Sequence, residues 1–287
     1  MTPVAPEAPE APEAPGQLYV VSTPIGNLGD FTHRAVEVLR AVGGILAEDT
    51  RHSRRLLDHY DIRTPVAAYH EHNEARTTPG LVARLQAGES LALISDAGTP
   101  LVSDPGARLV AAAAEGGVPV VPVPGASALL AALVASGLGA DRFTFYGFLP
   151  RKGGDRREAI AEILGLRHLA VLYEAPGRVA DTLVDLDEGG AGDRPAAVAR
   201  ELTKQFEEIR RGTVAELSAY YRDLAPRGEV VIVVGGATAA PPSEDALRDR
   251  ARELRRAGSS ARDVAAALVR ETGAPRNLAY RLAQEAE

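Results

Sequence analysis

The chain has 287 residues, of which 45% are hydrophobic and 25% charged, and its formal net charge is −7. This length predicts two domains, each able to bury a core of its own. The sequence contains no cysteine, which excludes disulfides, thiolate metal sites and cysteine nucleophiles. Its apolar runs are shorter than the roughly 18 residues of a membrane span. The N-terminus lacks the pattern of a signal peptide, so we expect a cytoplasmic protein.

Proline recurs at every third position of residues 1–16, a period that favours polyproline II conformation. The same segment carries three glutamates and no basic side chain, so three of the seven net negative charges lie there. We predict a disordered tail over residues 1–16 with no part in catalysis.

Short apolar segments alternate with amphipathic ones from residue 17 onward. The expected strands are 18–21, 45–47, 65–69, 91–94 and 119–123, and the expected helices are 33–42, 74–87, 107–115 and 126–136. Several of these strands are apolar on both faces, which is typical of a largely parallel sheet with helices on both sides. We therefore predict an N-terminal α/β domain over residues 17–140.

The same alternation resumes after the break at residues 137–141. Here the expected strands are 143–148, 169–173, 196–200 and 229–234, and the expected helices are 155–164, 178–186 and 214–224. This pattern predicts a second α/β domain over residues 141–236. The fold class is accordingly α/β, with two such domains.

Residues 237–287 combine a linker-like stretch with a segment that is helical only. Ser243 and Ser260 are expected N-caps of helices 244–257 and 261–271, Gly273 ends the second, and a third helix is expected over 275–286. Two short helices around a glycine turn are typical of a helix-turn-helix, and a plain three-helix appendage fits the pattern equally well.

Three Gly/Pro-rich loops follow strands, at residues 22–30, 95–106 and 122–128. None has the G-x-G-x-x-G or P-loop spacing, which disfavours a dinucleotide or Walker-type site. Ligands of open α/β sheets bind at such strand ends. Asp96 and Asp104 could receive ribose hydroxyls or form Asx turns that cap the next helix. Ser127 could cap a helix or contact a ligand.

Polar residues also follow two other strands, at 47–52 and 70–74. The pair His70 and His72 lacks a metalloprotease spacing, and we expect no metal there. His72, Glu74 and Asp49 are possible general bases, whereas Asp49 could instead be an N-cap and Glu74 a solvated helix start. A Gly-x-Ser-x-Gly nucleophile motif is absent, which disfavours a serine hydrolase.

Positive charge is concentrated in three segments of this acidic chain. Residues 151–157 hold four basic side chains against one acid, 246–282 hold nine arginines against four acids, and 51–63 hold four arginines against two. Guanidinium groups suit phosphate oxygens, so these segments indicate an RNA-facing surface. Ordinary solvated helix faces would produce the same pattern.

Eight stretches, taken in order, resemble the ribosomal RNA small-subunit methyltransferase I family of the tetrapyrrole methylase superfamily. They are residues 18–28, 47–52, 70–74, 95–106, 147–150, 173–174, 199–204 and 228–229. The resemblance extends from about Gln17 to Gly235 and excludes the proline repeat. The first loop departs from the G-x-G-P-G-D pattern of the wider superfamily, which favours the RNA branch over porphyrin and corrin methylases.

The resemblance implies two domains of tetrapyrrole methylase type with S-adenosylmethionine in the cleft between them, usually as a homodimer. The implied reaction is 2′-O-methylation of a cytidine in the decoding centre of 16S rRNA, in the small ribosomal subunit. The alternatives are a tetrapyrrole (porphyrin or corrin) C-methyltransferase and a non-catalytic RNA-binding ribosome-assembly factor.

Residue roles follow from the same resemblance. The residues assigned to the cofactor are Pro24, Asp96, Gly98, Thr99, Ser103, Ser127, Ala128, Tyr173 and Ala199. Asp49 and His72 are the proton-acceptor candidates. The residues assigned to RNA are Arg51, Arg151, Lys152, Arg156, Arg157 and Arg200.

Overall fold

The computed structural model describes residues 15–237 and 243–286. The chain divides into two compact units, residues 1–236 and residues 237–287. Most of the predicted tail, residues 1–14, lies outside the described residues, as do residues 238–242 of the predicted linker. Gly16, at the end of that tail, is buried, and its amide donates to the Leu85 carbonyl at 2.8 Å.

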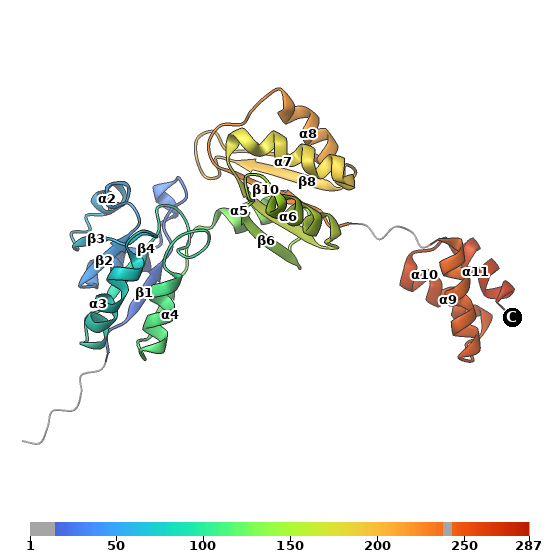
Figure 1. Cartoon of the computed structure of the whole chain (residues 1–287), viewed down its shortest axis with the longest axis horizontal. Helices are drawn as coiled ribbons and strands as arrows, with labels where there is room; N and C mark the ends of the chain where they lie inside the picture. The colour runs from blue at the N-terminus through green and yellow to red at the C-terminus, as the bar shows by residue number, and fades with distance from the viewer. Residues whose placement is uncertain (1–14, 238–242, 287) are drawn as a thin grey trace, which may run out of the picture. The chain divides into compact units, whose positions relative to one another are not determined.

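The first sheet contains five strands, all parallel, in the order β3-β2-β4-β1-β5 (Figure 1). Their bounds are β1 (Leu18–Val21), β2 (Gly44–Ala47), β3 (Val66–Ala68), β4 (Leu91–Ile94) and β5 (Val120–Val123). The side chains of β4 alternate between two buried cores, so both faces of the sheet are covered. This arrangement confirms the predicted parallel α/β sheet.

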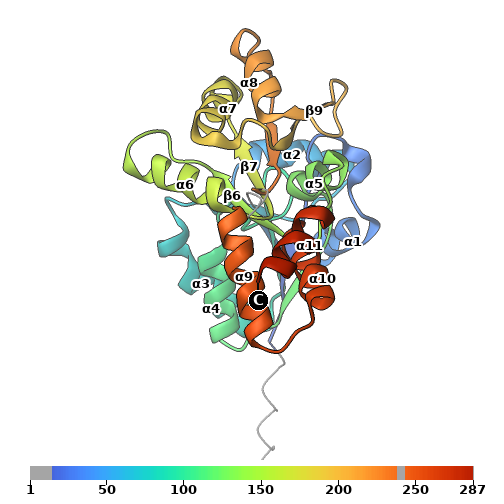
Figure 2. The same cartoon turned by 90° about the vertical axis from the view of Figure 1, so that its right-hand side faces the viewer.

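Four helices cover this sheet, two on each face. Helices α1 (His33–Ala41) and α2 (Thr50–His59) pack on the face that Ala92 and Ile94 share. Helices α3 (Glu74–Gln86) and α4 (Ala107–Glu115) lie side by side on the opposite face (Figure 2). Helix α2 was not predicted from the sequence, because its buried side comprises only Ser53, Leu56 and Leu57 in a strongly basic stretch.

The second sheet is mixed, with the order β6-β7-β10-β8-β9. Its bounds are β6 (Phe143–Phe148), β7 (Leu169–Glu174), β8 (Pro195–Arg200), β9 (Glu208–Thr213) and β10 (Val230–Val234). Only β6 and β7 pair in parallel, and the other neighbours are antiparallel. Strand β9 was missed by the sequence analysis because this edge strand, Glu-Ile-Arg-Arg-Gly-Thr, is mostly polar.

Helices cover both faces of the second sheet as well. Helices α6 (Gly154–Gly165), α7 (Val179–Leu186) and α8 (Val214–Arg222) share one core with it, and α7 and α8 pack against each other. Short helical turns, η1 (Leu28–Asp30), η2 (Pro176–Arg178) and η3 (Asp187–Ala191), occur within unit 1.

Helix α5 (Ala128–Ser136) covers the opposite face of the second sheet. Its buried residues Ala132 and Leu133 pack with Val171, Val231 and Val233. We expected this segment in an N-terminal domain ending at residue 140, yet its packing partners belong to the second sheet. Because α5 starts just after β5 of the first sheet, it connects the two α/β halves at the point where their loops meet.

The second unit contains α9 (Glu244–Arg256), α10 (Ala261–Thr272) and α11 (Arg276–Glu285), which share a core of their own. The predicted caps are confirmed: the hydroxyls of Ser243 and Ser260 accept from the third amide beyond them, each at 3.2 Å. Gly273 ends α10 with a φ of 70°, also as predicted. Among residues 15–237 and 243–286, no helix combines the length and apolarity that crossing a membrane requires.

Candidate active site

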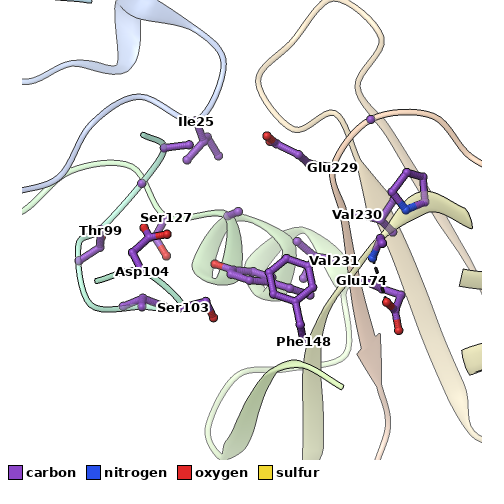
Figure 3. A pocket seen from close by; sticks show the side chains of 18 residues that line it. Ile25, Thr99, Ser103, Asp104, Ser127, Phe148, Glu174, Glu229, Val230 and Val231 are labelled. Atoms are coloured by element: carbon purple, nitrogen blue, oxygen red, sulfur yellow. Dashed lines mark hydrogen bonds between the residues drawn. The ribbon is translucent and has the colours of Figure 1, made fainter. Parts of the chain in front are cut away.

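A cavity of about 340 Å³ lies where loops of the first sheet meet the ends of strands in the second (Figure 3). The loops that follow β1, β4 and β5 form one wall, and Phe148, residues 173–176 and residues 228–231 form the other. Carboxyl ends of parallel strands are where open α/β sheets bind ligands, so this location agrees with the general rule. The lining is mainly apolar, with a few polar groups among it, as is usual for a small-molecule site.

Backbone hydrogen bonds join the loop after β1 to the loop after β4. Thr23 and Gly98 exchange two such bonds, at 2.8 Å and 3.1 Å, and form an isolated antiparallel bridge. The hydroxyls of Ser22 and Thr99 are 2.9 Å apart. Gly98 has a φ of 84°, a left-handed conformation that side chains disfavour. These contacts hold the two loops in one fixed arrangement beneath the cavity.

The segment before Asp104 has a strained backbone. Leu101 and Ser103 have φ values of 72° and 66°, which are uncommon for residues other than glycine. Such outliers cluster at functional sites, because the surrounding structure has to hold them in place. One such constraint comes from the second sheet: a side chain at Gly147, where β6 has a bulge, would come within 3.0 Å of the Ser103 hydroxyl.

Aromatic rings dominate the opposite wall. The Tyr173 ring lies edge-on to Phe148 and Phe145, with centroids 5.6 Å and 4.9 Å away. Phe148 is 57% exposed although it lines the cavity, so one of its faces is open to a ligand. Burial raises the pKa of the Tyr173 hydroxyl, which therefore stays protonated. This wall offers flat apolar surfaces of the kind that pack against a planar ring.

A buried carboxylate supports the aromatic wall. Glu174 accepts from the Thr182 hydroxyl at 2.6 Å and from the Ala175 amide at 2.9 Å, and it lies 3.3 Å from the Arg178 guanidinium. Thr182 in turn accepts from Arg156 at 3.1 Å. Every oxygen of Glu174 therefore has a partner, and the residue holds the end of β7 in place.

Acidic side chains gather beside the polar wall. Burial, with the nearby charges of Glu48 and Asp96, raises the pKa of Asp104 to about 6. The same causes, burial first and then Asp96, raise the pKa of Glu48. Both carboxylates follow strands of the first sheet, so the parallel topology brings them to one edge. Asp104 is the member of this group that lines the cavity.

Six of the nine residues assigned to the cofactor line this cavity, namely Gly98, Thr99, Ser103, Ser127, Ala128 and Tyr173. Pro24 and Asp96 instead line an adjacent pocket of about 340 Å³, together with Lys204. Ala199 is buried in the core between α5 and the second sheet, where its neighbours exclude it from the cavity. Ser127 is also the N-cap of α5, since its hydroxyl accepts from the Leu130 amide.

The two proton-acceptor candidates lie away from the cavity lining. Asp49 is the N-cap of α2, where its carboxylate accepts from the amides of Arg51 and His52 at 2.8 Å and 3.3 Å. These hydrogen bonds lower its pKa, so it is a weaker base than a free aspartate. His72 is exposed, with its ring 6.0 Å from that of His70. The part of the chain that the structure describes contains no cluster of three potential metal ligands. The catalytic role of Asp49 and His72 stays a prediction.

The residues assigned to RNA divide into exposed and buried groups. The exposed ones are Arg51, Arg151, Lys152 and Arg157. Arg156 is different: it is 9% exposed, and its guanidinium lies 2.6 Å from Asp185. That ion pair and the bond to Thr182 give Arg156 a structural role, so we no longer assign it to RNA. Arg200 pairs with Glu208 at 2.9 Å.

The lining residues that were not assigned to the cofactor include three with aromatic or acidic groups: Asp104, Phe148 and Glu174. All three occur in stretches that carried the family resemblance, and this was the signal that could have identified them as site residues. The sequence left Asp104 open as a ribose-hydroxyl acceptor or an Asx turn, whereas Phe148 looked like a strand residue and Glu174 like the residue after a strand.

Comparison with known proteins assigns the sequence to a family. The sequence pattern described as Tetrapyrrole (Corrin/Porphyrin) Methylases matches residues 17–218. A protein of Synechocystis sp. named Ribosomal RNA small subunit methyltransferase I is 47% identical over 95% of this chain and 99% of its own length. A protein of Mesorhizobium japonicum with the same name is 48% identical over 92% of this chain and 90% of its own.

The chain belongs to the ribosomal RNA small subunit methyltransferase I family of tetrapyrrole methylases. A solved structure with the same fold is uroporphyrin-III C-methyltransferase from Thermus thermophilus complexed with S-adenosylhomocysteine. It is 21% identical, has a TM-score of 0.54, and covers 77% of this chain and 97% of its own. Family membership confirms the resemblance found in the eight sequence stretches, and the shared fold confirms the predicted fold class.

Proposed function

We propose that this chain transfers a methyl group from S-adenosylmethionine to the ribose 2′-hydroxyl of a cytidine in the decoding centre of 16S rRNA. The observation that carries the proposal is the 47% identity to a relative named for small-subunit rRNA methylation, over 99% of that relative's length. The S-adenosylhomocysteine complex of the Thermus thermophilus protein supports the cofactor class. The substrate is an RNA in the small ribosomal subunit, and the cytoplasm is the compartment where it would be met.

The cavity fits the proposed cofactor. Its volume of about 340 Å³ falls in the range typical of small-molecule sites. The rings of Phe148 and Tyr173 would pack against the adenine, and the hydroxyls of Thr99, Ser103 and Ser127 would meet its polar groups. When bound, S-adenosylmethionine supplies a methyl group already activated on a sulfonium. The chain itself would orient the acceptor hydroxyl and exclude water.

Exposed arginines support RNA as the partner. Helix α2 carries Arg51, Arg54 and Arg55 on its outer side, three and four residues apart, so they share one helix face. Arg55 also lines the pocket next to the cavity. In the second unit, Arg252, Arg255 and Arg256 line a polar hollow. Guanidinium groups at these places would bind phosphates, and those of α2, next to the cavity, would direct the ribose toward it.

We include a homodimer in the proposal. Leu130 and Val134 on helix α5 are 51% and 73% exposed, and they lie one turn apart on the side away from the second sheet. A pair of large apolar side chains on an otherwise packed helix is expected at a protein interface. A Val134→Lys substitution should shift the sedimentation of the purified chain toward the monomer, and an unchanged dimer would place the interface elsewhere.

A labelled-methyl assay tests the reaction. Purified chain is incubated with labelled S-adenosylmethionine and, in parallel, with small-subunit particles, naked 16S rRNA and a porphyrinogen substrate. Label on a cytidine 2′-oxygen of the RNA is the expected result. Label on the porphyrinogen would indicate a tetrapyrrole C-methyltransferase instead. Calorimetric titration without detectable S-adenosylmethionine binding would indicate a non-catalytic RNA-binding factor.

The role of the second unit is tested separately. Removing Arg255 and Arg256 by substitution with Gln should lower the affinity for the RNA substrate and reduce the salt slope by about one per arginine. Arg270→Gln is the matched control, because Arg270 is exposed and pairs with Glu271 at 3.6 Å. If the wild type, the double variant and Arg270→Gln bind RNA with equal affinity, Arg255 and Arg256 of the second unit do not contribute to RNA binding.

A further inference from the structure

We infer that Asp104 is the catalytic proton acceptor for the hydroxyl that is methylated, at the junction between the cavity and a second depression that takes the acceptor ribose. The inference rests on the proposed function, because it presumes an RNA hydroxyl as the acceptor. Asp104 lies in the loop between β4 and α4, and in Figure 3 its carboxylate stands on the polar wall, across from Phe148.

The position of Asp104 between two hollows is the first observation. Besides the cavity, it lines a depression of about 310 Å³ that also involves Ser103, Glu71 and Glu74. A base for methyl transfer has to reach the acceptor oxygen while the methyl donor lies next to it. Asp104 and Ser103 are the residues common to both hollows, and of these two only Asp104 carries a carboxylate.

The loop backbone fixes this position. Leu101 and Ser103, both in left-handed conformation, precede Asp104, and Gly106 follows it with a φ of 129°. A side chain at Gly106 would come within 2.6 Å of Leu93 in the core. The loop is therefore packed tightly on the sheet below it, and the carboxylate is carried by a rigid segment rather than by a mobile one.

The charged surroundings suit proton acceptance. Glu48 and Asp96 act on Asp104 from the ends of β2 and β4, and Glu71 and Glu74 line the shared depression. The nearby Ser95 hydroxyl donates to the Gly98 carbonyl at 3.0 Å. Tyr173 faces Asp104 from the opposite wall. The nearest guanidinium of α4, Arg108, pairs with Glu74 at 3.4 Å. Burial first, and then the charges of Glu48 and Asp96, hold the pKa of Asp104 at about 6, so at pH 7 it is ionised yet more basic than an ordinary aspartate.

The step balances with groups already named. The 2′-hydroxyl proton passes to the Asp104 carboxylate, the hydroxyl oxygen forms the new O–CH₃ bond, and the electron pair of the broken C–S bond stays on sulfur. The sulfonium thereby becomes a neutral thioether, and Asp104 returns its proton to water after the product leaves. No oxidant, reductant or metal takes part in this balance.

The test compares Asp104→Asn with wild type at saturating RNA and S-adenosylmethionine. We expect turnover to fall by about 100-fold or more, since general base catalysis contributes about 10²–10⁴-fold. Calorimetric binding of S-adenosylmethionine should persist, which shows that the variant is folded. The wild-type rate should rise with pH through about 6, and this limb should vanish in the variant. Asp104→Glu, which keeps a carboxylate, should recover part of the rate.

Asp223→Asn is the matched control, an exposed aspartate at the end of α8 that lines neither hollow. It should turn over like wild type. If wild type is active and Asp104→Asn keeps both its rate and its pH limb, the inference is overturned while the proposed function stands. If wild type transfers no methyl to any RNA, the proposed function fails and this inference fails with it.

Discussion

Two carboxylates on opposite walls of the cavity, Glu174 and Asp104, differ in their surroundings. Glu174, on the aromatic wall, is fully buried, accepts two hydrogen bonds and lies beside Arg178. Asp104, on the polar wall, is partly exposed, and the charges that act on it, those of Glu48 and Asp96, are negative. Removing one partner of a satisfied buried ion pair destabilises a fold, whereas a carboxylate among like charges is itself costly for it.

The difference in surroundings assigns the two carboxylates different roles: Glu174 supports the wall, and Asp104 is placed to react. The aromatic wall is built of strand ends whose polar groups are paired, so it provides a fixed surface for a ligand. The polar wall combines left-handed residues, an acidic cluster and a carboxylate with a raised pKa. Perturbed groups of this kind concentrate at functional sites, because catalysis needs a reactivity that stability alone would remove.

The largest effect is expected from Glu174→Ala. The substitution leaves the Thr182 hydroxyl and the Arg178 guanidinium without their buried partner, and breaking such a pair lowers the free energy of unfolding by about 3 kcal/mol. Urea unfolding followed by circular dichroism measures this. Glu229→Ala on the same wall is the control, since the Glu229 side chain is 71% exposed and should matter little. Equal midpoints for both variants would contradict the supporting role of Glu174.

Asp104→Asn should act in the opposite direction on stability. The folded pKa of about 6 lies above the roughly 3.9 of an unfolded aspartate, so the folded state holds its proton more tightly. The free energy of unfolding contributed by Asp104 therefore falls as pH rises from about 4 to about 6. Above that window the variant should be more stable than wild type by about 2 kcal/mol, allowing for screening by water.

Urea midpoints of the two proteins at pH 4 and pH 7.5 measure this difference. The gap between them should be small at the lower pH and open at the higher one. A gap of the same size at both pH values would mean that Asp104 titrates normally. A protein that gains stability while losing turnover would show that the polar wall trades stability for activity.

A smaller effect is expected from Phe148→Ala on the aromatic wall. Stacking of a base on an aromatic side chain is worth about 1–3 kcal/mol, so the Kd for S-adenosylmethionine should rise by about tenfold or more. Phe206→Ala is the matched control, because Phe206 is 66% exposed and lies outside the cavity lining. Calorimetric titration of both variants decides the matter. If Phe148→Ala binds S-adenosylmethionine with unchanged affinity, the adenine does not pack against this wall.

The parts of the fold that could be predicted are those whose sequence pattern is local. Strands β1, β4 and β6 have the bounds expected from their apolar runs, and the caps Ser243 and Ser260 were found from single residues. Helix α2 and strand β9 were missed because tertiary contacts, rather than their own polar sequences, determine their conformation. The antiparallel pairing of the second sheet likewise depends on partners that are distant in the chain.

The sequence indicated which loops line the cavity, but not the environments of individual side chains. Residues such as Thr99 and Ser127 were found because Gly/Pro-rich loops at strand ends form a cavity in this fold class. Burial of Arg156 against Asp185 could not be read from its basic neighbours. The raised pKa of Asp104 depends on burial and then on Glu48, a residue 56 positions earlier, and only the folded sheet produces both.

The smallest effect is expected from Asp49→Asn, and it sharpens the contrast between aspartates. Asn is as good an N-cap as Asp, so α2 should keep its start and stability should hardly change. Turnover on RNA should stay within about twofold of wild type, as is usual for surface substitutions outside a site. His72→Ala, at an exposed position, should behave in the same way. Initial rates of methyl transfer measure both variants. A loss comparable to that of Asp104→Asn would instead favour Asp49 or His72 as the base. If Asp49→Asn and His72→Ala both keep the wild-type rate while Asp104→Asn is slow, the proton acceptor lies on the polar wall of the cavity.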